Sequence, residues 1–360
     1  MSSSKIYRLL DASSNRACEA VRVVEDVARF ILDDRLLTSE WKEFRHHLVS
    51  VLCAIPRQIR AAVRETESDV GTSFSLSTEL QRENVADLIA ANIARLQQSL
   101  RSLEEGAKIV APELASQVET LRYRSYTLAS AMEGIGQSNQ RLGDVRLYVL
   151  VAGCGSRDEF SRLIDSLLLA NVGAIQLRDK LLADADLLDR ARLLVEKCRG
   201  RRVFSIINDR PDIAVLAGAD GVHVGQTDLA VKDARQIVGP HRLVGVSTHN
   251  AEQVRRAVLD GANYAGIGPV FPSNTKSFSQ YGGLSLVQQV ATNTTLPLFA
   301  IGGINTENAE AVIQAGASRL AVGSAVTTAA DPNKIVALLK EMLQECDAKA
   351  LPSEATSPAL

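Results

Sequence analysis

The chain has 360 residues, of which 46% are hydrophobic and 23% are charged, and its formal net charge at pH 7 is −2. This balance predicts a globular fold with room for two domains or one large barrel, and it argues against a nucleic-acid binder, which needs a basic surface. The five cysteines form no CxxC pair, which argues against a disulfide framework or a thiolate zinc site. The sequence has no signal-peptide core or membrane-length apolar run, so we expect a cytoplasmic protein with no membrane partner.

Residues 1–137 carry helical periodicity and no credible strand. A segment with the composition of a helix N-cap, Asp11–Asn15, precedes the first of four apolar stripes, and Pro56 ends or interrupts the second. The stripes are Ala17, Val21, Val24, Ala28 and Ile31; Trp41, Phe44, Leu48, Val51 and Ile55; Ile89, Ile93, Leu96, Leu100, Leu103 and Ala107; and Leu114, Val118, Leu121, Leu128 and Met132. We therefore expect a bundle of four or five amphipathic helices.

Three segments of the chain have compositions typical of turns, linkers or tails. Residues 64–75 are rich in hydroxyl side chains, and Gly71 allows a tight turn within them. Residues 138–145 have the composition of an interdomain linker. Residues 346–360 are rich in alanine, serine and proline, which predicts a disordered tail.

Residues 146–345 alternate between short apolar runs and amphipathic stretches. The expected strands are Leu147–Val151, Ala174–Leu177, Val203–Ile207, Gly221–Val224, Leu243–Val246, Tyr264–Ile267, Leu298–Ile301 and Arg319–Val322. The expected helices are Asp158–Leu169, Asp184–Cys198, Ile213–Ala217, Val231–Ile237, Ala251–Leu259, Leu284–Val290, Thr306–Gln314 and Pro332–Leu343. Eight such repeats predict an α/β fold of the (β/α)₈ TIM-barrel type, whereas a doubly wound open sheet usually has fewer strands.

Two carboxylates follow neighbouring strands of this barrel. Asp209 follows the third strand and Asp228 follows the fourth, and parallel strands bring both to the same rim. Close carboxylates repel each other unless a cation lies between them, and Mg²⁺ is the usual cation where phosphates are present. Either residue alone could simply cap the following helix, so the prediction of a magnesium site depends on their convergence.

Glycine turns and basic residues mark two anion sites at the same rim. The turns Gly302-Gly303 and Gly323-Ser324 follow the last two strands, where barrels often bind phosphate, although plain tight turns are the alternative. Arg178, Lys180 and Lys276 supply positive charge on the other side, and with Mg²⁺ they suit a diphosphate. The two sites predict group transfer between two phosphorylated small molecules, with diphosphate as the leaving group.

Two histidines are candidates for a base at this rim. His223 lies between two valines inside the fourth strand, so a structural role is favoured, whereas His249 follows the fifth strand and could approach the site. No strong base is required if the diphosphate leaves first.

The C-terminal region resembles the thiamine phosphate synthase family over nearly all of residues 146–345. The matching motifs are Gln176–Lys180, Asn208-Asp209, Gly221–Asp228, Gly245–Ser247, Thr275-Lys276 and Ile301–Ile304. The family joins hydroxymethylpyrimidine diphosphate to a thiazole phosphate and releases diphosphate. Two departures are mild: Ser273 stands where threonine is usual, and Leu150–Ala152 stands where a Thr-Asp pair is usual.

The resemblance implies roles for individual residues. Those implied to bind the pyrimidine diphosphate are Gln176, Leu177, Arg178, Asp179, Lys180, Asn208, Ser247 and Lys276, of which Arg178, Lys180, Ser247 and Lys276 are implied to be catalytic. Those implied to bind the thiazole phosphate are Ser273, Asn274, Thr275, Gly303, Gly323 and Ser324. Asp209 and Asp228 are implied to hold Mg²⁺. The alternative is a tautomerase of the same fold, which lacks the full metal and diphosphate set.

The N-terminal region resembles a small domain found fused to such synthases. The matching segments are Arg8–Phe30 and Arg64–Thr72, and the resemblance implies a hydroxymethylpyrimidine phosphate kinase that uses ATP. Arg22, Glu25, Asp26 and Arg29 also give the first helix a charged face, for which a solvated set of ion pairs is the alternative explanation. Because no P-loop is present, the motifs alone do not indicate ATP binding. A non-catalytic dimerisation or docking module is the alternative, and a homo-oligomer is compatible with the sequence.

Overall fold

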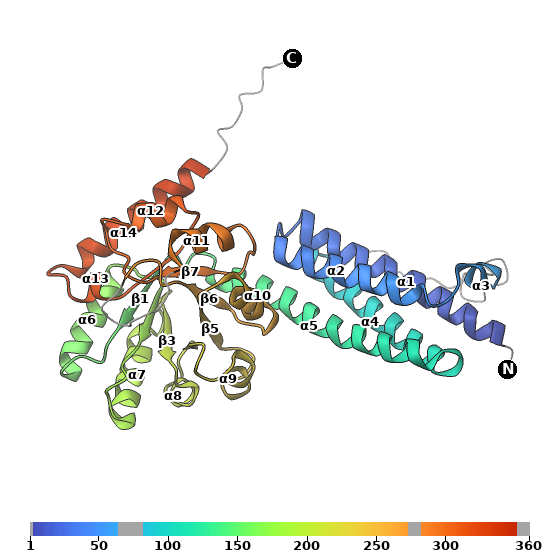
Figure 1. Cartoon of the computed structure of the whole chain (residues 1–360). Helices are drawn as coiled ribbons and strands as arrows, with labels where there is room; N and C mark the ends of the chain where they lie inside the picture. The colour runs from blue at the N-terminus through green and yellow to red at the C-terminus, as the bar shows by residue number, and fades with distance from the viewer. Residues whose placement is uncertain (1–2, 64–81, 273–281, 351–360) are drawn as a thin grey trace, which may run out of the picture. The chain divides into compact units, whose positions relative to one another are not determined.

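A computed structural model describes residues 3–63, 82–272 and 282–350 of the chain (Figure 1). The chain forms two compact units, Met1–Glu133 and Gly134–Leu360. No helix among the described residues is both long and apolar enough to cross a membrane.

The first unit, the helical unit, consists of α1 (Ser3–Phe30), α2 (Arg35–Leu52), α3 (Arg57–Ala62), α4 (Val85–Val110) and most of α5 (Pro112–Leu142). The α1 helix packs mainly against α4 and α2. Fully buried side chains of the predicted stripes form the core: Val21, Val24, Trp41, Phe44, Leu48, Leu96, Leu100, Leu103 and Leu121. The predicted helical periodicity is therefore confirmed in the described residues.

The start predicted for the first helix is wrong. The α1 helix begins at Ser3, and Asp11 is buried inside it rather than capping it. The helix starts earlier because Leu10 continues the apolar stripe toward the N-terminus. The Ser14 hydroxyl donates to the Leu10 carbonyl oxygen at 2.6 Å, so this polar residue is satisfied within the helix. A side-chain cap is instead seen at α2, where Asp34 accepts from the backbone N–H of Leu37.

The charged face predicted on the first helix divides into two kinds of contact. Arg22 and Asp26 form an exposed ion pair at 3.4 Å, as the solvated alternative expects. Glu25 is buried and accepts from Arg45 of α2 at 2.5 Å. Part of this face therefore holds two helices together.

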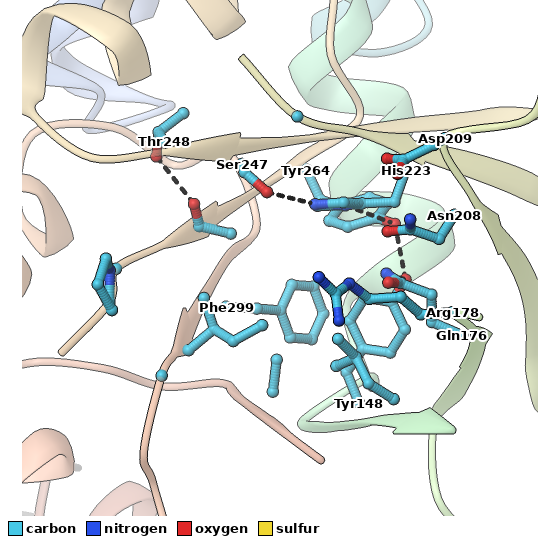
Figure 2. A pocket seen from close by; sticks show the side chains of 18 of the residues that line it. Tyr148, Gln176, Arg178, Asn208, Asp209, His223, Ser247, Thr248, Tyr264 and Phe299 are labelled. Carbon is cyan, nitrogen blue, oxygen red and sulfur yellow. Dashed lines mark hydrogen bonds between the residues drawn. The ribbon is translucent and has the colours of Figure 1, made fainter. Parts of the chain in front are cut away.

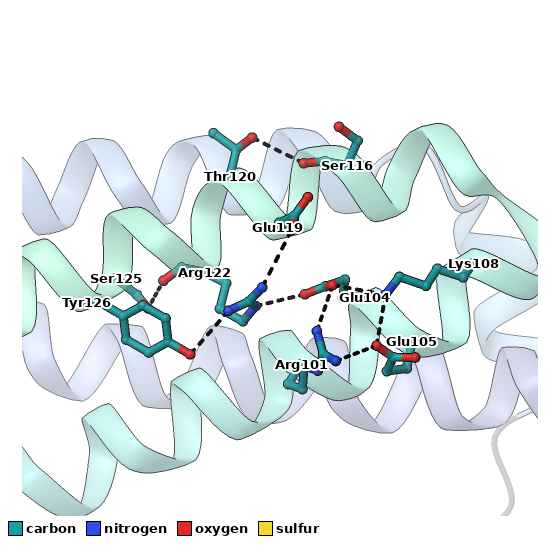
Figure 3. A network of polar contacts seen from close by, with 10 residues as sticks. All are labelled: Arg101, Glu104, Glu105, Lys108, Ser116, Glu119, Thr120, Arg122, Ser125 and Tyr126. Atoms are coloured by element: carbon teal, nitrogen blue, oxygen red, sulfur yellow. Dashed lines mark hydrogen bonds and ion pairs between the residues drawn. The ribbon is translucent and has the colours of Figure 1, made fainter.

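A second buried ion pair joins α4 to α5 (Figure 3). Glu104 accepts from Arg122 Nε at 2.7 Å and also pairs with Arg101 and Lys108. The Arg122 guanidinium also contacts the Tyr126 hydroxyl. Burial raises the pKa of Glu104, but hydrogen bonds from Arg122 and Lys108 outweigh it and hold the pKa below the usual range.

The segment expected to be a linker, residues 138–145, is largely helical, because α5 continues through Leu142. Leu142 is buried in the core of the second unit. The Ser138 hydroxyl is also buried there and accepts from the Asn263 side chain at 3.1 Å. The polar composition of this segment gave no indication that one of its faces is buried in the second unit.

The second unit is a closed barrel of eight parallel strands in the order β1 to β8, so the predicted TIM-barrel fold is confirmed (Figure 1). The strands are β1 (Leu147–Val151), β2 (Ala174–Leu177), β3 (Phe204–Asn208), β4 (Gly221–Val224), β5 (Leu243–Thr248), β6 (Tyr264–Ile267), β7 (Leu298–Ile301) and β8 (Leu320–Val322). The helices around them are α6 (Arg157–Leu169), α7 (Asp184–Cys198), α8 (Pro211–Ala217), α9 (Val231–Val238), α10 (Ala251–Leu259), α11 (Gly283–Ala291), α12 (Ala309–Gln314), α13 (Ser324–Thr327) and α14 (Pro332–Ala350).

The start of the predicted tail is wrong for residues 346–350, which belong to α14. Helix propensity is high in this stretch, because the sequence from Cys346 to Ala350 has no glycine or proline. The remainder of the predicted tail, residues 351–360, lies outside the described residues.

Candidate functional site

A cavity lies at the carboxyl ends of the strands, and seven of the predicted site residues line it (Figure 2). Its lining includes Gln176, Arg178, Lys180, Asn208, Asp209, Asp228 and Ser247. These side chains come from four consecutive strands and the turns that follow them. They converge because the parallel strands all end at the same rim.

The two predicted metal ligands lie side by side in this cavity. Burial raises the pKa of Asp209, and the neighbouring Asp228 carboxylate raises it further, while Lys180 opposes both effects. Lys180 Nζ lies 3.1 Å from Asp209 Oδ2, and Asp228 accepts from the backbone N–H of Gly225 at 2.8 Å. Asp209 also has a left-handed backbone, with φ of +60°, which a non-glycine residue adopts at a cost.

The donor set fits Mg²⁺. No group of three or more His, Cys, Asp or Glu side chains that could hold a metal occurs in the described parts of the chain. Two adjacent carboxylates supply hard oxygen ligands, and Mg²⁺ usually takes its remaining ligands from water and substrate phosphates. The repulsion that raises the pKa of Asp209 is the interaction that such a cation would remove.

Among the described residues of the predicted diphosphate set, two are absent from the lining of this cavity. Leu177 is fully buried. Asp179 accepts from the backbone N–H groups of Gly153, Leu181 and Leu182, at 3.0, 2.8 and 3.1 Å. Burial raises the pKa of Asp179, but these three hydrogen bonds outweigh it and lower the pKa. Asp179 therefore joins the turn after β1 to the turn that carries Lys180.

Sequence reasoning missed the aromatic residues that line the inner end of the cavity. Tyr148, Tyr264 and Phe299 pack edge to face, with ring centroids 5.4 to 5.8 Å apart. All three line the cavity (Figure 2). Each lies in an apolar strand run, and periodicity does not distinguish a cavity wall from a filled core. Their presence on strands whose side chains point into the barrel was the available signal.

Both histidines considered in the sequence line the cavity. His223 is buried in the barrel interior, and burial, followed by the Arg178 charge, lowers its pKa to about 4. It is therefore neutral at pH 7. His249 Nδ1 lies 2.5 Å from the backbone oxygen of Gly268.

A second cavity adjoins the first and is lined by the two glycine turns. Gly303, Gly323 and Ser324 all line it, together with Thr327 and Thr328, which the sequence reasoning did not include. Gly302 has a φ of +107°, and a Cβ there would lie 2.7 Å from Pro269. A side chain at that turn would therefore collide with the loop after β6.

Arg178 lines both cavities. The shared lining also includes Leu150, Ile301, Gly302 and Ala321. Two adjoining cavities with one cation between them suit two anionic ligands that react with each other.

Comparison with known families matches residues 147–326 to thiamine monophosphate synthase and residues 8–131 to the ThiD2 family. A thiamine-phosphate synthase of Rhodopirellula baltica is 41% identical over 359 residues, which cover 97% of this chain and 96% of the relative. The chain belongs to the thiamine-phosphate synthase family. A Synechocystis synthase is 37% identical, with 95% of this chain and 97% of that protein covered.

A solved structure supports the family assignment for the barrel. The thiamine phosphate pyrophosphorylase of Pyrococcus furiosus matches with a TM-score of 0.51 and 30% identity, covering 58% of this chain and 99% of that one. The ThiD2 match covers the helical unit, so both resemblances stated from the sequence are confirmed at the family level.

Several predicted residues of this family lie outside the described residues. They are Ser273, Asn274, Thr275 and Lys276, which come between β6 and α11 in the sequence, and the segment Arg64–Thr72. Their roles stay predictions from the sequence.

Proposed function

We propose that the barrel condenses 4-amino-2-methyl-5-hydroxymethylpyrimidine diphosphate with a thiazole phosphate, giving thiamine phosphate and diphosphate. The single observation that carries this proposal is the convergence of Asp209 and Asp228 with Arg178 and Lys180 in one cavity. A diphosphate with Mg²⁺ needs that combination of carboxylates and cations. Membership of the thiamine-phosphate synthase family supports this choice of reaction.

Asp209 and Asp228 would hold the Mg²⁺ ion, and the ion when bound would offset the negative charge of the leaving diphosphate. Arg178 and Lys180 add fixed positive charge where the diphosphate oxygens gain charge. Lys180 pairs with Asp209 in the structure. With substrate bound, it would contact both that carboxylate and the diphosphate. Asn208, Ser247 and, in the loop outside the described residues, Lys276 complete the proposed diphosphate contacts.

The aromatic wall supports the proposed position of the pyrimidine ring. Tyr148, Tyr264 and Phe299 offer apolar ring surface at the inner end of the cavity. The aminopyrimidine would stabilise the methylene cation that remains when the diphosphate leaves, and the thiazole nitrogen would then bond to that carbon. The cavity would hold the partners together, and the bound substrates would limit access of water to the cation.

We place the thiazole phosphate in the adjoining cavity. Gly303, Gly323 and Ser324 would contact its phosphate, and Thr327 and Thr328 add hydroxyl groups there. The predicted contacts from Ser273, Asn274 and Thr275 come from the loop outside the described residues. Arg178 lies between the two proposed positions, where it can contact both anions.

The test uses the full chain with both substrates and Mg²⁺, and thiamine phosphate is measured by chromatography. We expect product, a loss of product with EDTA, and a loss of product in the Asp209→Asn variant. Asp233→Asn is the matched control, because Asp233 is an exposed carboxylate on α9 that lines neither cavity. Conversion between thiazole tautomers without condensation would instead support the tautomerase alternative.

For the helical unit we propose phosphorylation of the pyrimidine monophosphate by ATP, which yields the diphosphate and ADP. The support is the ThiD2 match over residues 8–131. The full chain carrying Asp209→Asn should convert the monophosphate and ATP to diphosphate, which then accumulates and is visible by ³¹P NMR. If no diphosphate forms, the dimerisation or docking alternative is favoured.

A further inference from the structure

We propose that Gln176, Tyr148, Tyr264 and His223 form a directional hydrogen-bond relay that sets how the cavity contacts its ligand. The relay holds His223 as the Nε2–H tautomer and turns the Ser247 hydroxyl proton toward the cavity. These residues are thus positioning residues that act through Ser247. The role of that proton rests on the proposed function, whereas the tautomer does not.

The relay is continuous between β2 and β5 (Figure 2). Gln176 Nε2 donates to the Tyr148 hydroxyl at 2.7 Å, and that hydroxyl lies 2.9 Å from the Tyr264 hydroxyl. The Tyr264 hydroxyl lies 3.3 Å from His223 Nδ1. His223 Nε2 lies 3.0 Å from Ser247 Oγ.

Gln176 gives this chain its direction. An amide nitrogen only donates, so Tyr148 accepts from Gln176 and its own proton can go to a second partner. Within the described residues that proton's acceptor is the Tyr264 hydroxyl. Burial raises the pKa of both phenols, so both keep their protons at neutral pH. In the proposed relay Tyr264 accepts from Tyr148 and donates to His223.

The direction determines the state of His223. Its Nδ1 accepts from Tyr264, so the ring proton of the neutral imidazole lies on Nε2 and points at Ser247. The Ser247 oxygen then accepts from His223, and its own proton is left for the cavity. A buried histidine in this state is a donor to Ser247, which explains its presence without a role as a base.

The two ends of the relay face the cavity with opposite character. At one end Ser247 offers a donor, which suits an oxygen of a bound diphosphate. At the other end Gln176 Oε1 is buried and has no hydrogen-bond partner among the described residues. That free acceptor suits the amino group of an aminopyrimidine. One relay therefore offers a donor to the anionic end of the ligand and an acceptor to its ring.

The fold leaves space for the relay at Gly245. In the sheet register Gly245 lies between His223 of β4 and Tyr264 of β6. A Cβ at Gly245 would collide with the Tyr264 ring. The missing side chain lets that ring cross β5, so that its hydroxyl reaches His223.

The test is the tautomer of His223, measured by ¹⁵N NMR on the full chain without substrate at neutral pH. The chain has five histidines, so the His223→Asn spectrum identifies the signal. We expect the Nε2–H tautomer in the parent chain and a mixture of tautomers in Tyr148→Phe, Tyr264→Phe and Gly245→Ala. Gly266→Ala is the matched control, because a Cβ there meets His223 at an ordinary 3.6 Å. We expect it to keep the tautomer.

A second measurement tests the consequence for the ligand. We expect Tyr148→Phe and Tyr264→Phe to weaken binding of inorganic diphosphate with Mg²⁺ by about 5- to 10-fold in calorimetry, the size of one hydrogen bond. An Nδ1–H tautomer, a doubly protonated ring, or no change in Tyr264→Phe overturns the relay. Unchanged diphosphate affinity overturns its link to Ser247. The tautomer needs no turnover, so failure of the proposed reaction is distinguishable from failure of the relay.

Discussion

The helical unit and the barrel both bury polar side chains, but the partners of those side chains differ. In the helical unit, Glu104 is paired with Arg122, and Glu25 is paired with Arg45. In the barrel, a buried Gln176 oxygen has no partner among the described residues, as is also true of Trp41 Nε1 in the helical unit, but only Gln176 lines a cavity; Asp209 there lies against a second carboxylate. Satisfied charges join helices, whereas unsatisfied groups that face a cavity indicate a ligand. Burial alone does not separate the two cases.

The largest expected effect is on the stability of the helical unit. Glu104→Gln leaves the buried Arg122 with only the half-exposed Glu119 carboxylate, 3.8 Å away, as a counter-charge and should lower the free energy of unfolding by about 3 kcal/mol. Trp41 is the only tryptophan of the chain and is buried in this unit, so its fluorescence in a denaturant titration reports the loss selectively. Adding Arg122→Met should restore much of the stability. No recovery in the double variant would contradict the ion-pair explanation.

The same pair makes this stability depend on pH. Because the pKa of Glu104 is lowered in the fold, its contribution is complete above the ordinary value of 4.5 and is lost as the pH falls through the lowered value. The parent chain should therefore lose stability of the helical unit in acid more steeply than Glu104→Gln. Equal acid sensitivity of the two chains would exclude Glu104 as the source.

A change of similar size is expected in the barrel, where it affects the activation free energy of the reaction rather than the free energy of unfolding. Asp209→Asn should raise the activation barrier of condensation by about 2.7–4 kcal/mol, a 10²- to 10³-fold loss in kcat/KM, because the diphosphate charge is less well stabilised. The loss should come without reduced stability, since the change also removes repulsion from Asp228. Thermal unfolding measured beside kinetics separates the two effects. A destabilised but fully active variant would show that Asp209 is structural.

Asp179 lies between these cases, because its carboxylate is satisfied within the fold yet supports the turn that carries Lys180. Asp179→Ala leaves three backbone N–H groups without their acceptor. It should weaken the binding free energy of the pyrimidine diphosphate by about 1–3 kcal/mol, which is seen mainly as a raised KM. Asp179→Asn keeps one acceptor oxygen and should be intermediate. A loss confined to kcat would instead favour direct contact with the substrate.

The smallest effect is expected on the exposed face of α1. The side chains of Arg22 and Asp26 are 53% and 39% exposed, so Arg22→Ala should change stability by less than about 0.5 kcal/mol. If phosphorylation of the pyrimidine phosphate nevertheless disappears in this variant, the charged face has a functional role. Unchanged phosphorylation would leave the solvated ion pair as its explanation.

The regular alternation of two kinds of segment along the sequence was enough to predict the barrel and the residues at its rim. Short apolar runs separated by amphipathic stretches require parallel strands, and parallel strands carry residues such as Asp209 and Asp228 to one end. The glycine turns after β7 and β8 follow from the same argument. These predictions needed only the position of each residue along its strand. They needed no knowledge of which side chains lie next to it in the folded protein.

Tertiary structure decided which groups were already satisfied. Asp179 belongs to the same motif as Lys180, yet its carboxylate is held by backbone N–H groups from two turns. Tyr148 and Tyr264 come from β1 and β6, and their contact across the barrel interior depends on closure of the sheet. A one-dimensional pattern specifies the face on which a side chain lies, but its hydrogen-bond partners come from distant strands and are known only when the chain has folded.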